Sequence, residues 1–286
     1  MKYVIRRLLD SLSNHLKIRD AKFARNKKNL YRFQREDREF IDKMPGISMP
    51  MVIDPKMYLR VGYTDWIFEP ECIYFLRDCL NRGNTFMDVG ANIGYFSLFA
   101  AKRVGKTGSV FSFEPGKFAF DLLRRNKNLN RLGWLHIYNV GLGETDTIVP
   151  FNCGGPGDDV YSSLKEIRHP NASSKNFNRV NIRLFQGDSW RNSVGLDHIN
   201  LLKIDVEGAE YSVLKGMRQM LEEKKISRIM LEVSEEMAEG FEYSSADLCT
   251  FLEEKGYQCF KLGSYGKLMP ISNKTVIGDG MIVAES

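Results

Sequence analysis

The sequence predicts an α/β fold in which helices cover a mostly parallel, seven-stranded sheet that ends in an antiparallel hairpin. From residue 85 onward, short apolar runs alternate with helical segments, which is the pattern of a parallel sheet covered by helices. The last two extended runs, at 257–262 and 275–284, flank a turn region rich in Gly, Ser and Asn, which favours a final antiparallel pair. With 286 residues, 43% of them hydrophobic, the chain can bury the core of such a domain.

The first part of the chain carries the positive charge. The net charge is +5, but residues 1–43 hold 13 Lys or Arg and 6 Asp or Glu, so this part is +7 and the remainder is −2. Apolar residues recur at helical spacing between Val4 and Leu16, with basic residues around them, as in a basic amphipathic helix. We therefore expect a basic helical extension over residues 1–55, followed by one globular domain over residues 56–286.

The predicted N-terminal helix has several candidate docking surfaces: its own domain, an anionic membrane surface, a partner protein, or a sister subunit in a homo-oligomer. A nucleic-acid partner is not expected, because basic residues are not interleaved with aromatic ones across the rest of the chain. No apolar run reaches the roughly 18 residues of a membrane span, and the N-terminus lacks the apolar block of a signal peptide. The expected location is the cytoplasm.

The cysteines agree with that location. They are odd in number, scattered, and never spaced as CxxC, which argues against a zinc site. Their simplest state is a reduced thiol in a reducing compartment. The five positions are Cys72, Cys79, Cys153, Cys249 and Cys259.

The expected elements follow in order along the chain. An irregular segment rich in Met, Gly and Pro, at 44–55, leads into an extended piece at 57–61 and a helix at 70–80. A polar segment at 152–178 has no clear periodicity, and a segment of that length is more often a functional loop than a structureless one. The core strands are expected at 85–89, 109–113, 134–140, 199–204 and 226–233, with extended pieces at 146–151 and 180–185 and helices at 117–130, 210–221 and 244–254.

The turn after the first core strand is the best candidate for a ligand site. Residues 86–97 read FMDVGANIGYFS, a buried strand that runs through Gly90 and Gly94 into an apolar helix. A glycine turn of this kind exposes backbone N–H groups and lets a ligand approach the main chain. The strand alternation places the ligand crevice at this edge of the sheet.

The spacing of this turn favours one cofactor over another. A dinucleotide loop requires glycine where this chain has Asn92 and Tyr95, so an NAD(P)-dependent oxidoreductase is the weaker alternative. Asp88 before the turn suits a ligand with an amino group, and Glu114 at the end of the second strand suits a ribose diol. S-adenosylmethionine carries both groups.

At this point the sequence resembles the FkbM family of S-adenosylmethionine-dependent methyltransferases, which have the class I fold. The similarity lies in DVGANIGYFSLFAAK, VFSFEP, NVGLGETD, the Ser-Ser-Leu at 162–164 and LLKIDVEGAEYSVLKG. It covers roughly residues 62–233, and members of the family mostly methylate hydroxyl groups of glycans or polyketide-type products. The resemblance implies that the cofactor is bound by Asp88, Gly90, Asn92, Gly94 and Glu114, lined by Tyr95, Pro115 and Val140, with Asp188 in the less regular stretch LFQGDSW.

The fourth core strand carries the candidate catalytic residues. Its alternation places Lys203 and Asp205 on one face, and Glu207 follows in the loop. An alcohol needs a base or a metal before it attacks a methyl group, so Asp205 is the first candidate for the general base and Glu207 the second. The alternative role for Glu207 is to stabilise a helix N-terminus. Glu232, on the neighbouring strand, makes Mg²⁺ a further candidate, although no metal spacing is diagnostic.

The sequence therefore predicts an O-methyltransferase that acts on a hydroxyl group, with a sugar in a glycan or a glycosylated natural product as the favoured acceptor. The alternatives that stay open are a nucleic-acid methyltransferase that uses the basic arm and a non-catalytic scaffold. His136 and His198 begin strands far from the crevice and are expected to be structural. His169, in the 152–178 segment, is the one histidine placed to act as a base.

Overall fold

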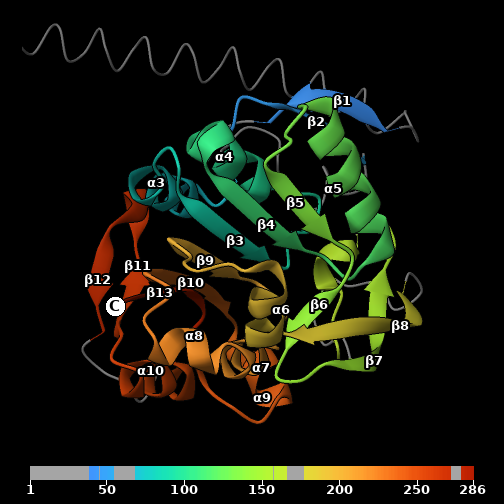
Figure 1. Cartoon of the computed structure of the whole chain (residues 1–286). Helices are drawn as coiled ribbons and strands as arrows, with labels where there is room; N and C mark the ends of the chain where they lie inside the picture. The colour runs from blue at the N-terminus through green and yellow to red at the C-terminus, as the bar shows by residue number, and fades with distance from the viewer. Residues whose placement is uncertain (1–38, 45, 55–67, 157, 166–176, 272–277) are drawn as a thin grey trace, which may run out of the picture.

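The computed structural model describes residues 39–44, 46–54, 68–156, 158–165, 177–271 and 278–286 (Figure 1). Three predictions lie outside these residues: the basic N-terminal helix, the extended piece at 57–61, and the role of His169.

A large mixed sheet forms the centre of the molecule, with strand order β12-β11-β13-β10-β9-β3-β4-β5 in the described residues. From β10 to β5 neighbouring strands are parallel, whereas β13 runs antiparallel to both β10 and β11. The predicted fold class is confirmed, and the short strand β12 adds an edge to the seven strands expected. The bounds are β3 Thr85–Val89, β4 Ser109–Phe113, β5 Leu135–Tyr138, β9 Leu201–Ile204, β10 Arg228–Val233, β11 Gln258–Leu262, β12 Leu268–Pro270 and β13 Gly280–Glu285.

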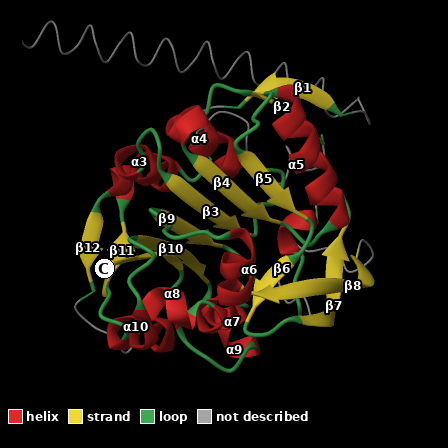
Figure 2. Ribbon diagram, in the orientation of Figure 1, coloured by secondary structure: helices red, strands yellow, loops and turns green. Residues whose placement is uncertain are grey.

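Helices cover both faces of this sheet (Figure 2). One face carries α3, α4 and α5, and the other carries α6 to α10, as the two large clusters of buried side chains show. The bounds are α3 Pro70–Cys79, α4 Tyr95–Val104, α5 Lys117–Leu129, α6 Gly187–Val194, α7 Glu210–Gly216, α8 Arg218–Glu222, α9 Glu235–Gly240 and α10 Ser245–Glu254. None of the helices in the described ranges is long and apolar enough to cross a membrane.

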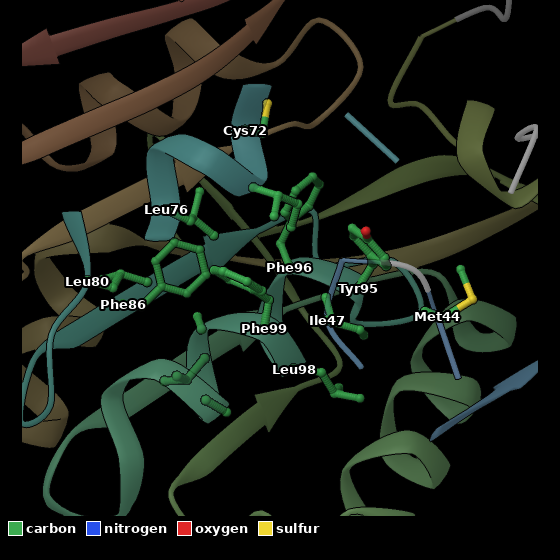
Figure 3. Close-up of a cluster of buried hydrophobic side chains, with 14 of the residues drawn as sticks. Met44, Ile47, Cys72, Leu76, Leu80, Phe86, Tyr95, Phe96, Leu98 and Phe99 are labelled. Carbon is green, nitrogen blue, oxygen red and sulfur yellow. The ribbon is translucent and has the colours of Figure 1, made fainter. Parts of the chain in front are cut away.

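The segment before the domain is more regular than expected. The 44–55 region was predicted to be irregular, but β1 (Phe40–Lys43) and β2 (Pro50–Ile53) pair as an antiparallel hairpin. The physical reason is tertiary: Met51 and its two successors are buried, and the Asn126 side chain of α5 accepts a hydrogen bond from the Val52 N–H at 2.6 Å. Figure 3 shows Met44 and Ile47 beside the aromatic side chains of α4. The division of the chain at residue 55 stays a prediction.

Strand β9 shows the predicted alternation. Leu201 belongs to the cluster under α3 and α4, whereas Leu202 and Ile204 belong to the cluster under α7 to α10. Lys203 therefore lies on the same face as Leu201, and its side chain is buried with 1% exposure. A charged side chain in that position must have a partner.

The single helix expected after the fourth strand is two short helices, α7 and α8, which meet at Met217. Asp188 of α6 explains the break. Its carboxylate accepts hydrogen bonds from the N–H groups of Gln219 and Met220 at 2.8 and 3.0 Å, so α8 begins anew at a capping carboxylate.

A smaller sheet flanks the central one, with order β6-β8-β7. It consists of β6 Gly141–Gly143, β7 Thr147–Gly154 and β8 Phe177–Gln186. The ends of the predicted irregular segment, 152–178, are therefore strand. Ser163 pairs with Asn152, and residues 158–163 lie at the carboxyl ends of β3 and β4, where Asp159, Tyr161 and Ser162 form one wall of a cavity.

Candidate active site

A cavity of about 330 Å³ opens at the carboxyl ends of β3, β4, β9 and β10, where an open α/β sheet places its ligands. Of the predicted site residues, it brings together eight, which are named first in the list that follows; Asp88, Gly94, Val140 and Asp188 do not line it. The lining includes Gly90, Asn92, Tyr95, Glu114, Pro115, Lys203, Asp205 and Glu207, together with Phe68, Glu69, Phe96, Phe151, Asp159, Tyr161, Ser162 and Glu232.

Gly90 is required by its surroundings as well as by its backbone angle. Its φ is +84°, and a Cβ at this position would lie 1.7 Å from the backbone oxygen of Asp205. The turn after β3 and the chain leaving β9 thus touch at the main chain. Gly94, with φ +94°, leaves room for Leu123 of α5, so its role in this structure is packing at the start of α4.

The turn does not offer free backbone donors, and that part of the prediction is wrong. The N–H groups of Gly90 and Ala91 both donate to the Phe113 oxygen at 3.0 Å. The Asn92 N–H donates to Glu114 Oε2 at 2.9 Å, and the Ile93 N–H donates to the side chain of Asn92 at 2.8 Å. The N–H groups of the turn are thus occupied by hydrogen bonds within the protein. The turn contributes to the cavity through its side chains and the path of its main chain.

Glu114 is held rigidly at the end of β4. Its Oε1 accepts from the Gly116 N–H at 2.7 Å, while Oε2 accepts from Asn92. Burial raises the pKa of this carboxyl to about 8, although the two backbone hydrogen bonds oppose the change. A carboxylate has about four acceptor positions, so Glu114 can still receive two hydroxyl groups from the cavity side.

Asp88 lies beneath the cavity rather than in its wall. Its Oδ2 accepts from the Ser97 hydroxyl at 2.5 Å, and Ser97 also contacts the Ser112 hydroxyl at 2.8 Å. Burial raises the pKa of Asp88, and the charge of Lys203 opposes that shift. Asp88 therefore supports Lys203 and α4 from below, and its proposed contact with the cofactor's amino group has no support from the geometry.

Lys203 and Asp205 form a buried ion pair, as the shared face of the strand predicted. The distance from Nζ to Oδ2 is 2.7 Å, and the ammonium group lies 4.7 Å from the centre of the Phe96 ring. Burial alone would lower the pKa of Lys203, but the carboxylates of Asp205, Asp88 and Glu69 together raise it above its ordinary value. Burial opposes ionisation of Asp205, yet Lys203 holds the pKa of this aspartate below its usual range.

Glu232 interacts with Asp205, and the pKa values of the two carboxyl groups depend on each other. The charge of Asp205, followed by burial, raises the pKa of Glu232 well above its ordinary value, and the protonated carboxyl donates a hydrogen bond to Asp205. The described residues contain no group of three or more His, Cys, Asp or Glu arranged to hold a metal ion. The Mg²⁺ alternative has no support and is not carried further.

Glu207 differs from its neighbours in the loop after β9. Its φ is +53°, an unusual value for a residue with a Cβ. Burial raises its pKa well above the ordinary value, and the charges of Asp205 and Glu210 add to the effect. Glu210, by contrast, accepts from the N–H groups of Val206 and Gly208 at 3.1 and 3.2 Å and from Tyr243 at 2.6 Å. The helix-stabilising role that was considered for Glu207 is thus filled by Glu210.

The loop after β7, which lies in the segment predicted to be a functional loop, supplies a wall of the cavity. Asp159 and Tyr161 are the lining residues of this loop that were not predicted. Asp159 accepts a hydrogen bond from the Asn92 side chain at 3.0 Å, so the loop is joined to the glycine turn. The Ser162 hydroxyl accepts from the Gly154 N–H at 2.9 Å, and the Ser163 hydroxyl donates to the Glu207 oxygen at 3.2 Å. The paired acids at 158–159 inside a Gly-rich segment were the one signal available.

Glu69 is the second residue that sequence reasoning missed. It stands at the N-cap of α3 with φ 41° and ψ 66°, and it faces Lys203 across the cavity. Its position before Pro70 marks a helix start, but nothing in that pattern indicates a ligand. His136 and His198 lie away from the cavity, as expected; His136 stacks on Phe111 and His198 contacts the Ser227 hydroxyl at 2.9 Å.

These features define a class of protein: an α/β enzyme fold with one acidic, partly aromatic cavity at the carboxyl edge of its sheet. A sequence model of the methyltransferase FkbM domain matches residues 88–259. The chain belongs to the FkbM methyltransferase family, as its resemblance predicted. This membership favours the methyltransferase prediction over the oxidoreductase alternative.

Characterised relatives are similar over part of their length. Methyltransferase 1 of Beauveria bassiana is 30% identical over 46% of this chain and 57% of its own. The hexuronic acid methyltransferase AglP of Haloferax volcanii is 24% identical over 58% of this chain and 62% of its own. The 2-O-methyltransferase NoeI of Sinorhizobium fredii is 26% identical over 47% and 58%. The chain thus spans less than two thirds of each relative.

Among solved structures, the methyltransferase FkbM from Methylobacillus flagellatus superposes with a TM-score of 0.44 and 18% identity, covering 76% of this chain and 50% of that one.

Proposed function

We propose that this protein transfers the methyl group of S-adenosylmethionine to a hydroxyl group of an uncharged sugar. The observation that carries the proposal is the pairing, in one cavity, of a rigid carboxylate suited to a ribose with a cluster of carboxylates suited to proton removal. Glu114 provides the first, and Asp205 with Glu207 provides the second. Family membership supports the same reaction.

The residues present fit this cofactor. Glu114 has acceptor capacity left for the two ribose hydroxyls, and Asn92 and Gly116 fix its orientation. Tyr95 and Pro115 line the cavity beside it and suit the apolar parts of the ligand. When bound, S-adenosylmethionine supplies an electrophilic methyl group on a sulfonium. The protein's task is then to align the acceptor oxygen and remove its proton.

Glu207 is the better candidate for the base, which reverses the order set by the sequence. A carboxylate whose pKa is held low by Lys203 is a weak proton acceptor, and Asp205 is of that kind. Glu207 lines the same cavity and has a raised pKa, because it is buried beside Asp205 and Glu210, so it accepts a proton more readily than Asp205 does. We assign Asp205, fixed by Lys203 and Glu232, to orienting the acceptor hydroxyl.

The charge of the cavity supports an uncharged acceptor. Within the described residues, six acidic side chains line it and Lys203 is the one cation among them; Lys203 is already paired with Asp205. An acceptor with its own carboxylate would find no free cation among these side chains and would meet repulsion from the acids that are ionised. A neutral polyhydroxyl compound would instead find hydrogen-bond acceptors and the rings of Phe151 and Tyr161.

The direct test is methyl transfer from labelled S-adenosylmethionine to two matched sets of acceptors, neutral hexosides and the corresponding hexuronosides. We expect label on the neutral set, with roughly tenfold or lower transfer to the uronosides, in keeping with like-charge repulsion of about 1.4 kcal/mol or more. Faster transfer to the uronosides would contradict the assignment of the acceptor. Label on amines or on RNA instead of hydroxyls would contradict O-methylation itself.

A further inference from the structure

Glu69 lines the cavity and has one carboxylate oxygen without a hydrogen-bond partner in the described residues. It lies where the chain enters α3, and the ring of the preceding Phe68 packs on Tyr95 and Phe96, with centroids 5.6 and 6.1 Å apart. These contacts fix the segment against the start of α4. The Oε2 atom of Glu69 is buried and has no hydrogen-bond partner in the part of the chain that the structure describes. An unpaired carboxylate oxygen of this kind is costly unless a ligand satisfies it.

The neighbouring cation does not satisfy this oxygen. Lys203 is the charged group opposite Glu69, but its ammonium is paired with Asp205 at 2.7 Å and lies over the Phe96 ring. The other oxygen of Glu69 interacts with the thiol of Cys72. The carboxylate therefore has room for one further donor, and a positively charged donor fits best.

We propose that Glu69 binds the ammonium group at the amino-acid end of the cofactor, an inference that rests on the proposed function because it takes S-adenosylmethionine as the methyl donor. An ammonium carries three N–H donors and a full charge, which matches a buried carboxylate with a vacant acceptor position. The assignment replaces Asp88, which lies beneath the cavity. Glu114 would hold the ribose at the other end of the ligand.

The charged surroundings of Glu69 make its binding detectable through protons. Burial raises its pKa to about 7, the charge of Lys203 lowers it, and that of Asp205 raises it again. An ammonium group bound to Glu69 favours the ionised form, so the carboxyl must release a proton when the ligand binds near neutral pH. The titratable groups that face it are Lys203, Asp205, Glu71, Cys72, Tyr95 and Glu232.

The experiment compares two ligands and two variants by calorimetric titration. S-adenosylhomocysteine has the amino-acid end and 5′-methylthioadenosine lacks it, while both keep the adenosine. Glu69→Gln is expected to weaken S-adenosylhomocysteine binding by roughly tenfold to a hundredfold, as for a charge-assisted hydrogen bond, and to leave 5′-methylthioadenosine binding unchanged. Glu144→Gln is the control, because Glu144 is an exposed glutamate paired with Lys215 and lies outside the cavity lining; it should change neither affinity.

Proton release gives an independent readout. Titration at pH 6.5 in two buffers of different ionisation enthalpy should show more protons released with S-adenosylhomocysteine than with 5′-methylthioadenosine. The comparison cancels any proton released by Glu114, which contacts the ribose of both. Glu69→Gln should remove the excess.

The outcomes separate this inference from the proposed function. If the unaltered protein binds neither ligand, the proposed function fails. If Glu69→Gln weakens both ligands equally, or weakens neither while slowing methyl transfer, the proposed function stands and the assignment of Glu69 to the ammonium group is overturned.

Discussion

The two ends of the cavity differ in how their carboxylates are held. At the β4 end, Glu114 accepts two backbone hydrogen bonds and stands alone. At the β9 end, Asp205 forms an ion pair with Lys203. The charge of Asp205 also raises the pKa of Glu232 and of Glu207. The first arrangement is rigid and suits a ligand part that never changes. In the second arrangement, the ionisation of one carboxyl group changes the pKa of its neighbours, which suits a site where a proton must move.

The largest expected effect tests the reactive end. Glu207→Gln should lower kcat by about 10² to 10⁴, the usual contribution of a general base, while S-adenosylhomocysteine affinity stays within about threefold. Asp205→Asn serves as the comparison, because it removes a charge without removing the proposed base. Single-turnover rates for the two variants decide the order: a slower Asp205→Asn enzyme with a normal Glu207→Gln enzyme would return the role of base to Asp205.

A second experiment tests the junction between the two ends. Gly90→Ala should destabilise the protein by about 3 kcal/mol, because the new methyl group would collide with the Asp205 oxygen at a left-handed backbone position. Gly133→Ala is the matched control, since a Cβ there meets nothing within 4 Å, and its effect should stay within about 0.5 kcal/mol. Urea denaturation measures the free energy of unfolding of both variants. Equal midpoints would show that the contact between Gly90 and Asp205 is not tight.

At the rigid end of the cavity, beside β4, the expected effect is smaller and concerns the affinity for the cofactor product. Glu114→Gln replaces one carboxyl oxygen, a hydrogen-bond acceptor, with an amide NH₂ group that can only donate, so S-adenosylhomocysteine affinity should fall by roughly thirtyfold to a hundredfold. Glu144→Gln, at an exposed glutamate paired with Lys215, should leave the affinity unchanged. Calorimetric titration provides the measurement, and unaltered affinity in Glu114→Gln would separate this carboxylate from the ribose.

The smallest effect is a pH dependence of stability without ligand. The carboxyl of Glu114 has a pKa of about 8 in the folded protein against an ordinary 4.5. Between these values the unfolded chain loses a proton that the folded protein keeps, so the free energy of unfolding falls as pH rises. Glu114→Gln should flatten that fall between pH 4.5 and 8, because the variant has no group there to titrate. Denaturation curves at both ends of the window, with an identical fall in the variant, would contradict the assignment.

Much of the fold could be predicted because it depends on local pattern. Alternation in β9 placed Lys203 and Asp205 together, and the glycine turn located the cavity. The β1–β2 hairpin could not be predicted, since its stability comes from Asn126, some 74 residues away in the chain. A contact between distant segments leaves no periodic trace in either of them.

The site residues also divide into those that the sequence could predict and those that it could not. Glu114 follows a strand that the sequence marks clearly, and the structure places it in the cavity. Asp88 also belongs to a strand that the sequence marks clearly. It nevertheless lies under the cavity, because its side chain turns toward Ser97 of α4. Glu69 and Asp159 reach the cavity from segments outside the core strands, so their positions depend on how α3 and the loop after β7 pack. Sequence spacing identifies the strands' own carboxylates and misses those brought in by tertiary structure.

The contact between Gly90 and Asp205 has a consequence for hybrids between members of the family. Because the two main chains touch, the turn that follows β3 and the exit from β9 must be kept as a unit in any hybrid between family members. Asp159 and Ser163 are joined to that unit by hydrogen bonds to the Asn92 side chain and to the backbone oxygen of Glu207. A hybrid that exchanges residues 158–163 between relatives must therefore keep both of these contacts.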